Sequence, residues 1–307
     1  MHRQAGGRIP ASPVDRHMIW LAKILLRLFA WLPDPAPYRL ARRSAGVWMR
    51  LSPGKKRVAQ TNLRNCFPDH ASSAFGPLLK DSFVHYVCSI LEAGRNAYWP
   101  LTRLQGLCED VQGRDILDRA LDNGRGVLIL APHFGAWEYL GLWLQIHYDM
   151  AILYKPPEHP GLEKALLRMR ARGGGRMLPA TAAGLRQLYA HIAAAGVAAL
   201  LPDQQPTAGQ GRFAPFFGIP ALTGVLAPRL VSKSGCIALF VVCERLHTGH
   251  YRIHVIPADD DIYSADMDLA LKAVNCGVEQ CIAIDPAQYL WSYKRFRTRP
   301  PGELPLY

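Results

Sequence analysis

From about residue 101 onwards, short apolar runs alternate with amphipathic stretches. The run 126–131 (GVLILA) contains no polar side chain, which is typical of a strand buried on both faces. The next stretch, 136–147, has the apolar spacing of a helix. Strands that alternate with helices predict an α/β domain with a mostly parallel sheet flanked by helices. The other expected strands are 151–154 and 197–201 with a hairpin over 237–256, and the other expected helices are 161–172, 182–195, 224–234 and 266–284.

The N-terminal third has a different pattern, with long amphipathic stretches at 38–51, 58–66 and 78–98 that predict helices. A stretch rich in glycine, proline and phenylalanine, 209–223, is expected to be a loop. We therefore divide the chain into a flexible basic tail (1–17), a membrane-interface helix (18–33), a helical N-terminal region (34–100) and an α/β domain (101–307).

The apolar segment MIWLAKILLRLFAWL begins at Met18 and contains Lys23 and Arg27. Its 15 residues would form a helix about 22 Å long, which is shorter than the roughly 30 Å hydrocarbon core of a bilayer. Both basic residues fall on one side of that helix, as in helices that lie in the membrane interface. Since no small-residue cleavage site follows, we interpret the segment as a retained anchor and not a signal peptide. The alternative is a helix packed on the protein's own core.

The formal charge of +12 is concentrated at the two ends of the chain. Residues 1–70 hold 13 Lys/Arg and 3 Asp/Glu, and residues 287–307 hold 4 and 1. Because no nucleic-acid-binding motif accompanies these ends, an anionic membrane surface or an acidic partner is the better interpretation, and we expect no nucleic acid. The seven cysteines include no CxxC pair, so we expect reduced thiols and no metal site.

His133 follows the buried run 126–131 directly, and Pro132 prevents a helix from starting before it. Ligands of open α/β sheets bind at the carboxyl ends of the strands, where His133 is expected. Glu138 lies five residues on, about 140° around a helix axis, so the two can meet only if His133 precedes the helix that contains Glu138. Gly135 permits such a turn. The other interpretation is a core histidine and a helix-surface glutamate.

In that geometry His133 would act as general base and Glu138 would orient its ring. No serine or cysteine adjoins the pair to act as a nucleophile, so the proton would come from a hydroxyl of the substrate. This arrangement favours direct acyl transfer.

Several motifs then agree with one family. They are NLRNCFP (62–68), APHFGAWE (131–138), YKP (154–156), RAR (170–172), LPDQ (201–204), FAPFFGIPALT (213–223) and PAQYLWSYKRFRTRP (286–300). In order and spacing they resemble the late acyltransferases of lipid A biosynthesis, the lauroyl and myristoyl transferases of the lysophospholipid acyltransferase superfamily. The resemblance covers about residues 18–307 and implies a glycerol-phosphate-acyltransferase-like α/β fold.

The resemblance implies transfer of a fatty acyl chain from acyl carrier protein, or from acyl-CoA, to a hydroxyl of a Kdo-bearing lipid A precursor. It also implies a place on the cytoplasmic face of the bacterial inner membrane, either peripheral, monotopic or single-pass, and no resident cofactor. The implied residues are His133 and Glu138 for catalysis, Lys155, Arg170, Arg172, Asp203 and Arg295 for binding of the polar substrate, and Trp137, Phe213, Phe216 and Phe217 for an acyl groove.

The chain departs from the family pattern near its C-terminus. Tyr293-Lys294-Arg295-Phe296-Arg297 stands where the family usually has His-Arg-Arg-Phe-Lys, and Ala287 stands where glutamate is common. A different acceptor would account for the change at Tyr293. Three alternatives therefore stay open: an acyltransferase for another lipid, such as an aminolipid or lysophospholipid, a non-catalytic membrane-binding homologue, and a hydrolase of acyl thioesters.

Overall fold

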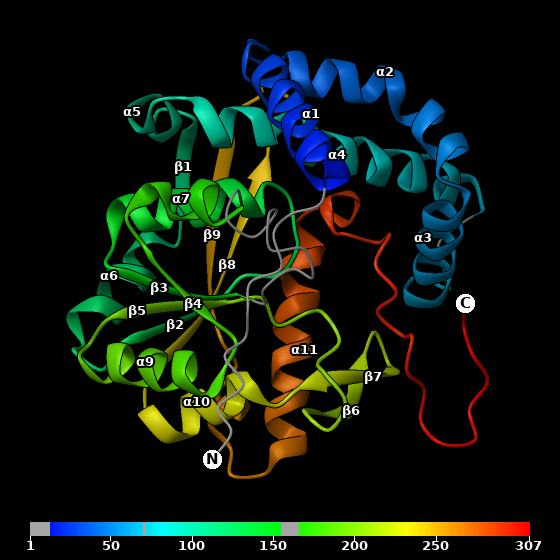
Figure 1. Ribbon diagram of the computed structural model, residues 1–307. Coiled ribbons are helices and arrows are strands. Elements are labelled where there is room, and N and C mark those ends of the chain that lie inside the picture. Colours follow the sequence, from blue (N-terminus) through cyan, green and yellow to red (C-terminus); the bar gives the residue numbers. More distant parts are fainter. Residues whose placement is uncertain (1–12, 70–71, 155–165) are drawn as a thin grey trace, which may run out of the picture.

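The structure is a computed structural model that describes residues 13–69, 72–154 and 166–307. Seven strands form a central sheet in the order β1-β9-β8-β2-β5-β3-β4 (Figure 1). Within the described residues, β8 and β9 are the antiparallel pair of this sheet and its other neighbours are parallel, so the predicted fold class is confirmed. The strands are β1 (Cys108–Gln112), β2 (Val127–Leu130), β3 (Met150–Tyr154), β4 (Arg176–Pro179), β5 (Val197–Leu200), β8 (Ile237–Arg245) and β9 (Tyr251–Pro257).

Both faces of the sheet are buried. In β2, Leu128 and Leu130 belong to one apolar cluster, whereas Val127 and Ile129 belong to another, because successive side chains of a strand point to opposite faces. One face is covered by α9 (Ala182–Ala193), α10 (Leu226–Ser234) and α11 (Met267–Ile284), and the other by α6 (Arg114–Asp122) and α7 (Trp137–His147). This double burial is the reason that the strand run contains no polar residue.

The predicted loop at 209–223 is wrong, because this stretch is a β-hairpin of β6 (Gly211–Phe216) and β7 (Ile219–Gly224). Phe216 pairs with Ile219, so the turn has two residues, Phe217 and Gly218, with φ of 49° and 74°. Positive φ at both positions is typical of the type I′ hairpin turn. The prolines in each strand suggested a loop, but a two-stranded sheet has free edges at which a missing N–H is tolerated. The elements between residues 101 and 122, α5 (Leu101–Gln105), β1 and α6, were also missed.

The N-terminal region is helical, as predicted, and lies along one end of the sheet (Figure 1). Here α3 (Pro53–Cys66) lies beside the C-terminal segment, because the Asn62 amide donates hydrogen bonds to the carbonyls of Trp291 and Tyr293 at 2.7 and 2.8 Å. The first and last family motifs are therefore in contact. The helices of this region are α1 (Pro13–Ala30), α2 (Ala36–Leu51), α3 (Pro53–Cys66) and α4 (Ser72–Tyr98).

Helix α1 packs against α4 at Gly94, where a Cβ would lie 2.4 Å from the Leu26 carbonyl oxygen. The helix begins at Pro13, so residues 13–17 are helical and were wrongly assigned to the tail, whereas residues 1–12 lie outside the described part. Among the described residues, no helix has both the length and the apolar character needed to cross a membrane. The large apolar side chains that stay exposed on α1 and just after its end are Trp20, Leu21, Leu25, Leu28 and Trp31.

Candidate active site

His133 and Asp203 meet at the carboxyl edge of the sheet because their strands are neighbours in register. Leu130 of β2 pairs with Leu200 of β5, and His133 and Asp203 each lie three residues beyond these partners. His133 Nδ1 lies 2.9 Å from Asp203 Oδ1, and the His133 backbone N–H donates to Oδ2 at 3.0 Å. One carboxylate therefore binds both the ring and the backbone of the histidine.

The surroundings of Asp203 favour its ionised form. The side chain is 3% exposed, and burial alone would raise its pKa, but attraction and hydrogen bonding to His133 outweigh burial and lower the pKa. A carboxylate at Nδ1 assigns the ring proton to that nitrogen and leaves Nε2 as an acceptor. The Gln204 amide lies 3.1 Å from Nε2 and can donate to it. Nε2 is thus the ring atom able to take a proton from a substrate.

The turn after His133 is held by backbone hydrogen bonds on both sides. The Gly135 N–H donates to the Gln288 carbonyl and the Ala136 N–H donates to the Cys243 carbonyl, each at 2.9 Å. Gly135 has φ of 54°, and a Cβ there would lie 1.9 Å from the Cys243 oxygen, so this position requires glycine. Helix α7 starts two residues later, which confirms that His133 precedes the helix that contains Glu138.

Glu138 is not the partner of the His133 ring in this geometry. Both of its carboxylate oxygens accept hydrogen bonds from Arg170, with Nε to Oε2 at 3.0 Å. The imidazole turns toward the neighbouring strand end instead of folding back over the first turn of α7, so Asp203 occupies Nδ1. The expected pairing is therefore corrected: Asp203, placed earlier among the substrate-binding residues, orients the ring.

The other expected anion-binding residues have different surroundings. Arg295 is 2% exposed, and its guanidinium donates to the Leu222 carbonyl at 2.7 Å and to Thr223 Oγ1 at 2.9 Å, which contradicts a role as a substrate clamp. Arg172 donates to backbone carbonyls at the end of α4, whereas Arg170 is 32% exposed beside Glu138. Lys155 lies outside the described residues.

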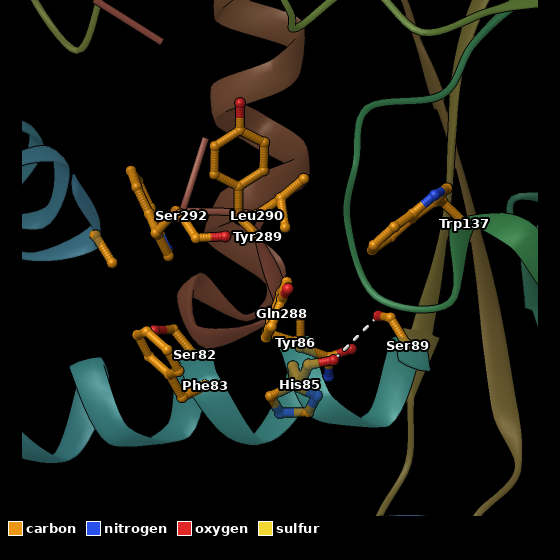
Figure 2. Close-up of a pocket in the computed structure, with 12 residues that line it drawn as sticks. Ser82, Phe83, His85, Tyr86, Ser89, Trp137, Gln288, Tyr289, Leu290 and Ser292 are labelled. Carbon is orange, nitrogen blue, oxygen red and sulfur yellow. Dashed lines mark hydrogen bonds between the residues drawn. The ribbon is translucent and has the colours of Figure 1, made fainter. Parts of the chain in front are cut away.

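Of the four expected groove aromatics, Trp137 is the one placed beside His133, with ring centroids 5.5 Å apart. Trp137 faces Tyr289 and Leu290 across a small pocket above α4 (Figure 2). This pocket holds about 10 Å³, about one water molecule, so an acyl chain does not fit without movement of its walls. Phe216 is buried in the core, Phe217 packs on Phe67 and Trp291, and Phe213 is half-buried in β6.

A repeated pattern in the sequence could have revealed the partner of His133. After each of two buried apolar strands come three residues: an apolar residue, a proline and a polar residue. These stretches are Leu130-Ala131-Pro132-His133 and Leu200-Leu201-Pro202-Asp203. Parallel neighbours place such residues at the same edge, but that inference also requires β2 and β5 to be adjacent.

Comparison with known proteins identifies the family of the chain. The family model described as bacterial lipid A biosynthesis acyltransferase matches residues 10–298. The chain belongs to this family. It is therefore an acyltransferase, and the resemblance of its motifs is confirmed.

Named relatives of the acyltransferase align along nearly their whole length. The lipid A biosynthesis palmitoleoyltransferase of Escherichia coli (strain K12) is 28% identical over 293 residues, 94% of each protein. The lauroyltransferase of the same organism is 25% identical over 287 residues, 93% of each protein. A lipid A biosynthesis acyltransferase of Haemophilus influenzae is 28% identical over 289 residues, which cover 93% of this chain and 89% of the relative. The alignments thus include both the helical region and the sheet.

Proposed function

We propose that the acyltransferase moves a fatty acyl chain from a thioester on acyl carrier protein to a hydroxyl of a lipid A precursor, with His133 as general base. The observation that supports this mechanism best is the His133–Asp203 pair, in which the carboxylate lies 2.9 Å from Nδ1. Nε2 then accepts the proton of the acceptor hydroxyl as its oxygen attacks the thioester carbonyl. The C–S bond breaks, the thiolate takes that proton from the imidazolium, and an oxygen ester and a free thiol result.

Negative charge develops on the thioester oxygen during this step and needs hydrogen-bond donors. Helix α7 begins at Trp137, four residues after His133. The first amides of a helix point along its axis without partners inside the helix, and the positive end of the helix dipole lies there. We assign stabilisation of this oxyanion to the amides that open α7.

We assign binding of a phosphate or sugar carboxylate of the acceptor to Arg170. Its guanidinium is partly exposed, and Glu138, at the start of α7, binds it through two hydrogen bonds. In this proposal Glu138 orients Arg170 and not His133. A planar guanidinium held in this way favours bidentate binding of an anion.

The membrane partner in this proposal is the cytoplasmic surface of the inner membrane. Five large apolar side chains at α1 are exposed, and Lys23 and Arg27 lie on the same helix. A basic amphipathic helix of this kind binds an anionic lipid interface. The basic ends of the chain also suit acyl carrier protein as an acidic donor.

The test is the variant His133→Ala with acyl-acyl carrier protein and a Kdo-bearing lipid A precursor, followed by mass spectrometry of the lipid product. Loss of a general base should lower turnover roughly 10²- to 10⁴-fold. His250→Ala is the matched control, since His250 also pairs with a carboxylate, Glu109, at 2.7 Å, but lies in the β8–β9 turn and, among the described residues, makes no hydrogen bond with His133 or Asp203. Near-normal turnover of His133→Ala would reject the mechanism. Release of free fatty acid without acceptor would instead indicate a hydrolase.

A further inference from the structure

We propose that Arg245, together with Gln288, is a positioning residue that holds the catalytic turn in its working conformation. Arg245 lies at the end of β8, and one of its terminal nitrogens donates to the Gly135 carbonyl at 3.0 Å. Gly135 is two residues from His133. This inference rests on the proposed role of His133 as general base.

The same two residues hold both polar groups of the Gly135 backbone. The Gly135 carbonyl accepts from the Arg245 side chain, and the Gly135 N–H donates to the Gln288 carbonyl. The Gln288 side-chain amide also binds the Arg245 backbone: its Oε1 accepts from the backbone N–H of Arg245 at 2.8 Å, and its Nε2 donates to the Arg245 carbonyl at 3.0 Å. The turn is therefore bound to the β8 end and to η3 (Pro286–Gln288) at once.

The Arg245 guanidinium is in turn fixed by α4. Nε donates to Glu92 Oε1 at 2.8 Å and a terminal nitrogen donates to Oε2 at 2.9 Å, which is a bidentate pair. The third nitrogen lies 3.1 Å from His85 Nδ1, where burial and the adjacent Arg245 charge keep the pKa of the imidazole well below its usual value. A neutral His85 accepts this hydrogen bond. The guanidinium thus has one orientation, and that orientation points at Gly135.

Burial indicates that Arg245 acts through the turn and not on substrate. The Arg245 side chain is 1% exposed and Glu92 is 4% exposed. A buried ion pair contributes little net stability compared with a well-packed apolar pair, so its geometric specificity is its clearer effect. Here that specificity acts on Gly135, a backbone position with positive φ that lies two residues from His133, whose ring must align with Asp203.

Arg245→Lys in the full-length enzyme tests this inference, since lysine keeps the charge but cannot bind Glu92 in bidentate fashion and Gly135 together. We expect kcat to fall roughly 30- to 100-fold, as for a misplacement of about 1 Å, with KM for both substrates within about twofold. Arg95→Lys is the matched control, because Arg95 is 2% exposed and also binds Glu92, at 2.9 Å. Within the described part of the chain, the other side-chain hydrogen bonds of Arg95 go to Asp34, Tyr251 and Gly249 and not to the turn at Gly135. We expect its kcat to stay within about threefold of wild type at a similar loss of thermal stability.

A spectroscopic measurement separates positioning from stability. In enzyme labelled at histidine Cε1 with ¹³C, the His133 resonance, assigned with His133→Asn, should shift in Arg245→Lys and stay in place in Arg95→Lys. Equal kcat losses in the two lysine variants, or an unmoved His133 resonance, would overturn the inference. If Arg245→Lys does not fold, Gln288→Met takes its place, with an expected kcat loss of roughly tenfold; unchanged kcat in that variant also overturns it. Should His133→Ala stay active while the resonance still shifts, the proposed mechanism fails and the positioning contact stands.

Discussion

Both oxygens of the Asp203 carboxylate bind His133, one through the ring and one through the backbone N–H. Each of these groups of His133 is a donor, so the site needs two acceptors on one side chain. The Tyr289 phenol also hydrogen-bonds with Asp203, and burial together with the Asp203 charge raises the pKa of that phenol well above its usual value. The phenol stays protonated and acts as a donor. Asp203 is thus an acceptor for both His133 and Tyr289.

Asp203→Asn places an NH₂ group against one of these donors and should therefore misalign the imidazole. We expect kcat to fall roughly 10²- to 10⁴-fold with KM little changed, because the ring loses its tautomer and orientation while the substrate contacts remain. Steady-state kinetics with saturating acyl donor measures this loss. Asp149→Asn is the control, since Asp149 is 66% exposed and pairs with Arg176 at 2.9 Å. Full activity of Asp203→Asn would mean that another group orients His133.

The lowered pKa of Asp203 also predicts a pH dependence of stability. A carboxyl group whose pKa is lower in the folded state stabilises the fold above its unfolded pKa of about 3.9, and this contribution is lost as the pH falls through the folded value. Wild type should therefore unfold at a higher temperature than Asp203→Asn at neutral pH, and the difference should shrink below about pH 4. Calorimetry from pH 7 to pH 3 measures it; a difference that grows on acidification contradicts the assignment.

At the scale of elements, the sequence predicted those helices and strands whose pattern of buried residues is visible in the local sequence. The all-apolar runs of β2 and β5 and the amphipathic stretches of α9 and α11 were sufficient, because their periodicity matches the sheet and helix repeats. The β6–β7 hairpin was missed because its prolines and its positive-φ Phe217 depend on pairing between segments and not on local preference.

Contacts between segments that are distant in sequence also decide much of the site, so the sequence predicted only its local part. The position of His133 before α7 follows from Pro132 and Gly135, which are local. The choice of Asp203 over Glu138 depends on which strands are neighbours, and the burial of Arg295 depends on contacts with β7 and α11. A family motif identifies such residues without separating those that meet substrate from those that hold the fold.

The contact between helix α3 and the C-terminal segment includes the Asn62 side chain, which is buried at 1% exposure. Asn62→Ala leaves the carbonyls of Trp291 and Tyr293 without their donor, and we expect a loss of about 2 kcal/mol in the free energy of unfolding. Denaturant titration measures it, and hydrogen exchange should increase over residues 289–296. Asn65→Ala removes a contact inside α3 alone, to the Thr61 carbonyl, and should leave that exchange unchanged.

At the scale of the whole molecule, α1 lies with the helical region at one end of the sheet, while α11 begins toward the opposite end (Figure 1). Large apolar side chains of α1 are exposed. The variant with Leu21, Leu28 and Trp31 changed to serine should bind vesicles containing anionic lipid at least about tenfold more weakly, because each apolar side chain contributes to insertion. Flotation measures this. Leu269→Ser removes a comparably exposed leucine (42%) from α11 and should bind like wild type. Equal binding of all variants would place the membrane contact elsewhere.

His133 and Asp203 each lie three residues after the paired residues Leu130 and Leu200. The loop after β2 and the loop after β5 must therefore keep matching lengths for the two side chains to meet. Removal of one residue between Leu130 and His133 would draw the imidazole back by about 3.3 Å, more than a hydrogen bond tolerates. A matching deletion between Leu200 and Asp203 would draw the carboxylate back by the same amount. Over evolutionary time, these two short connections should therefore lengthen or shorten together, even though some 70 residues of chain separate them.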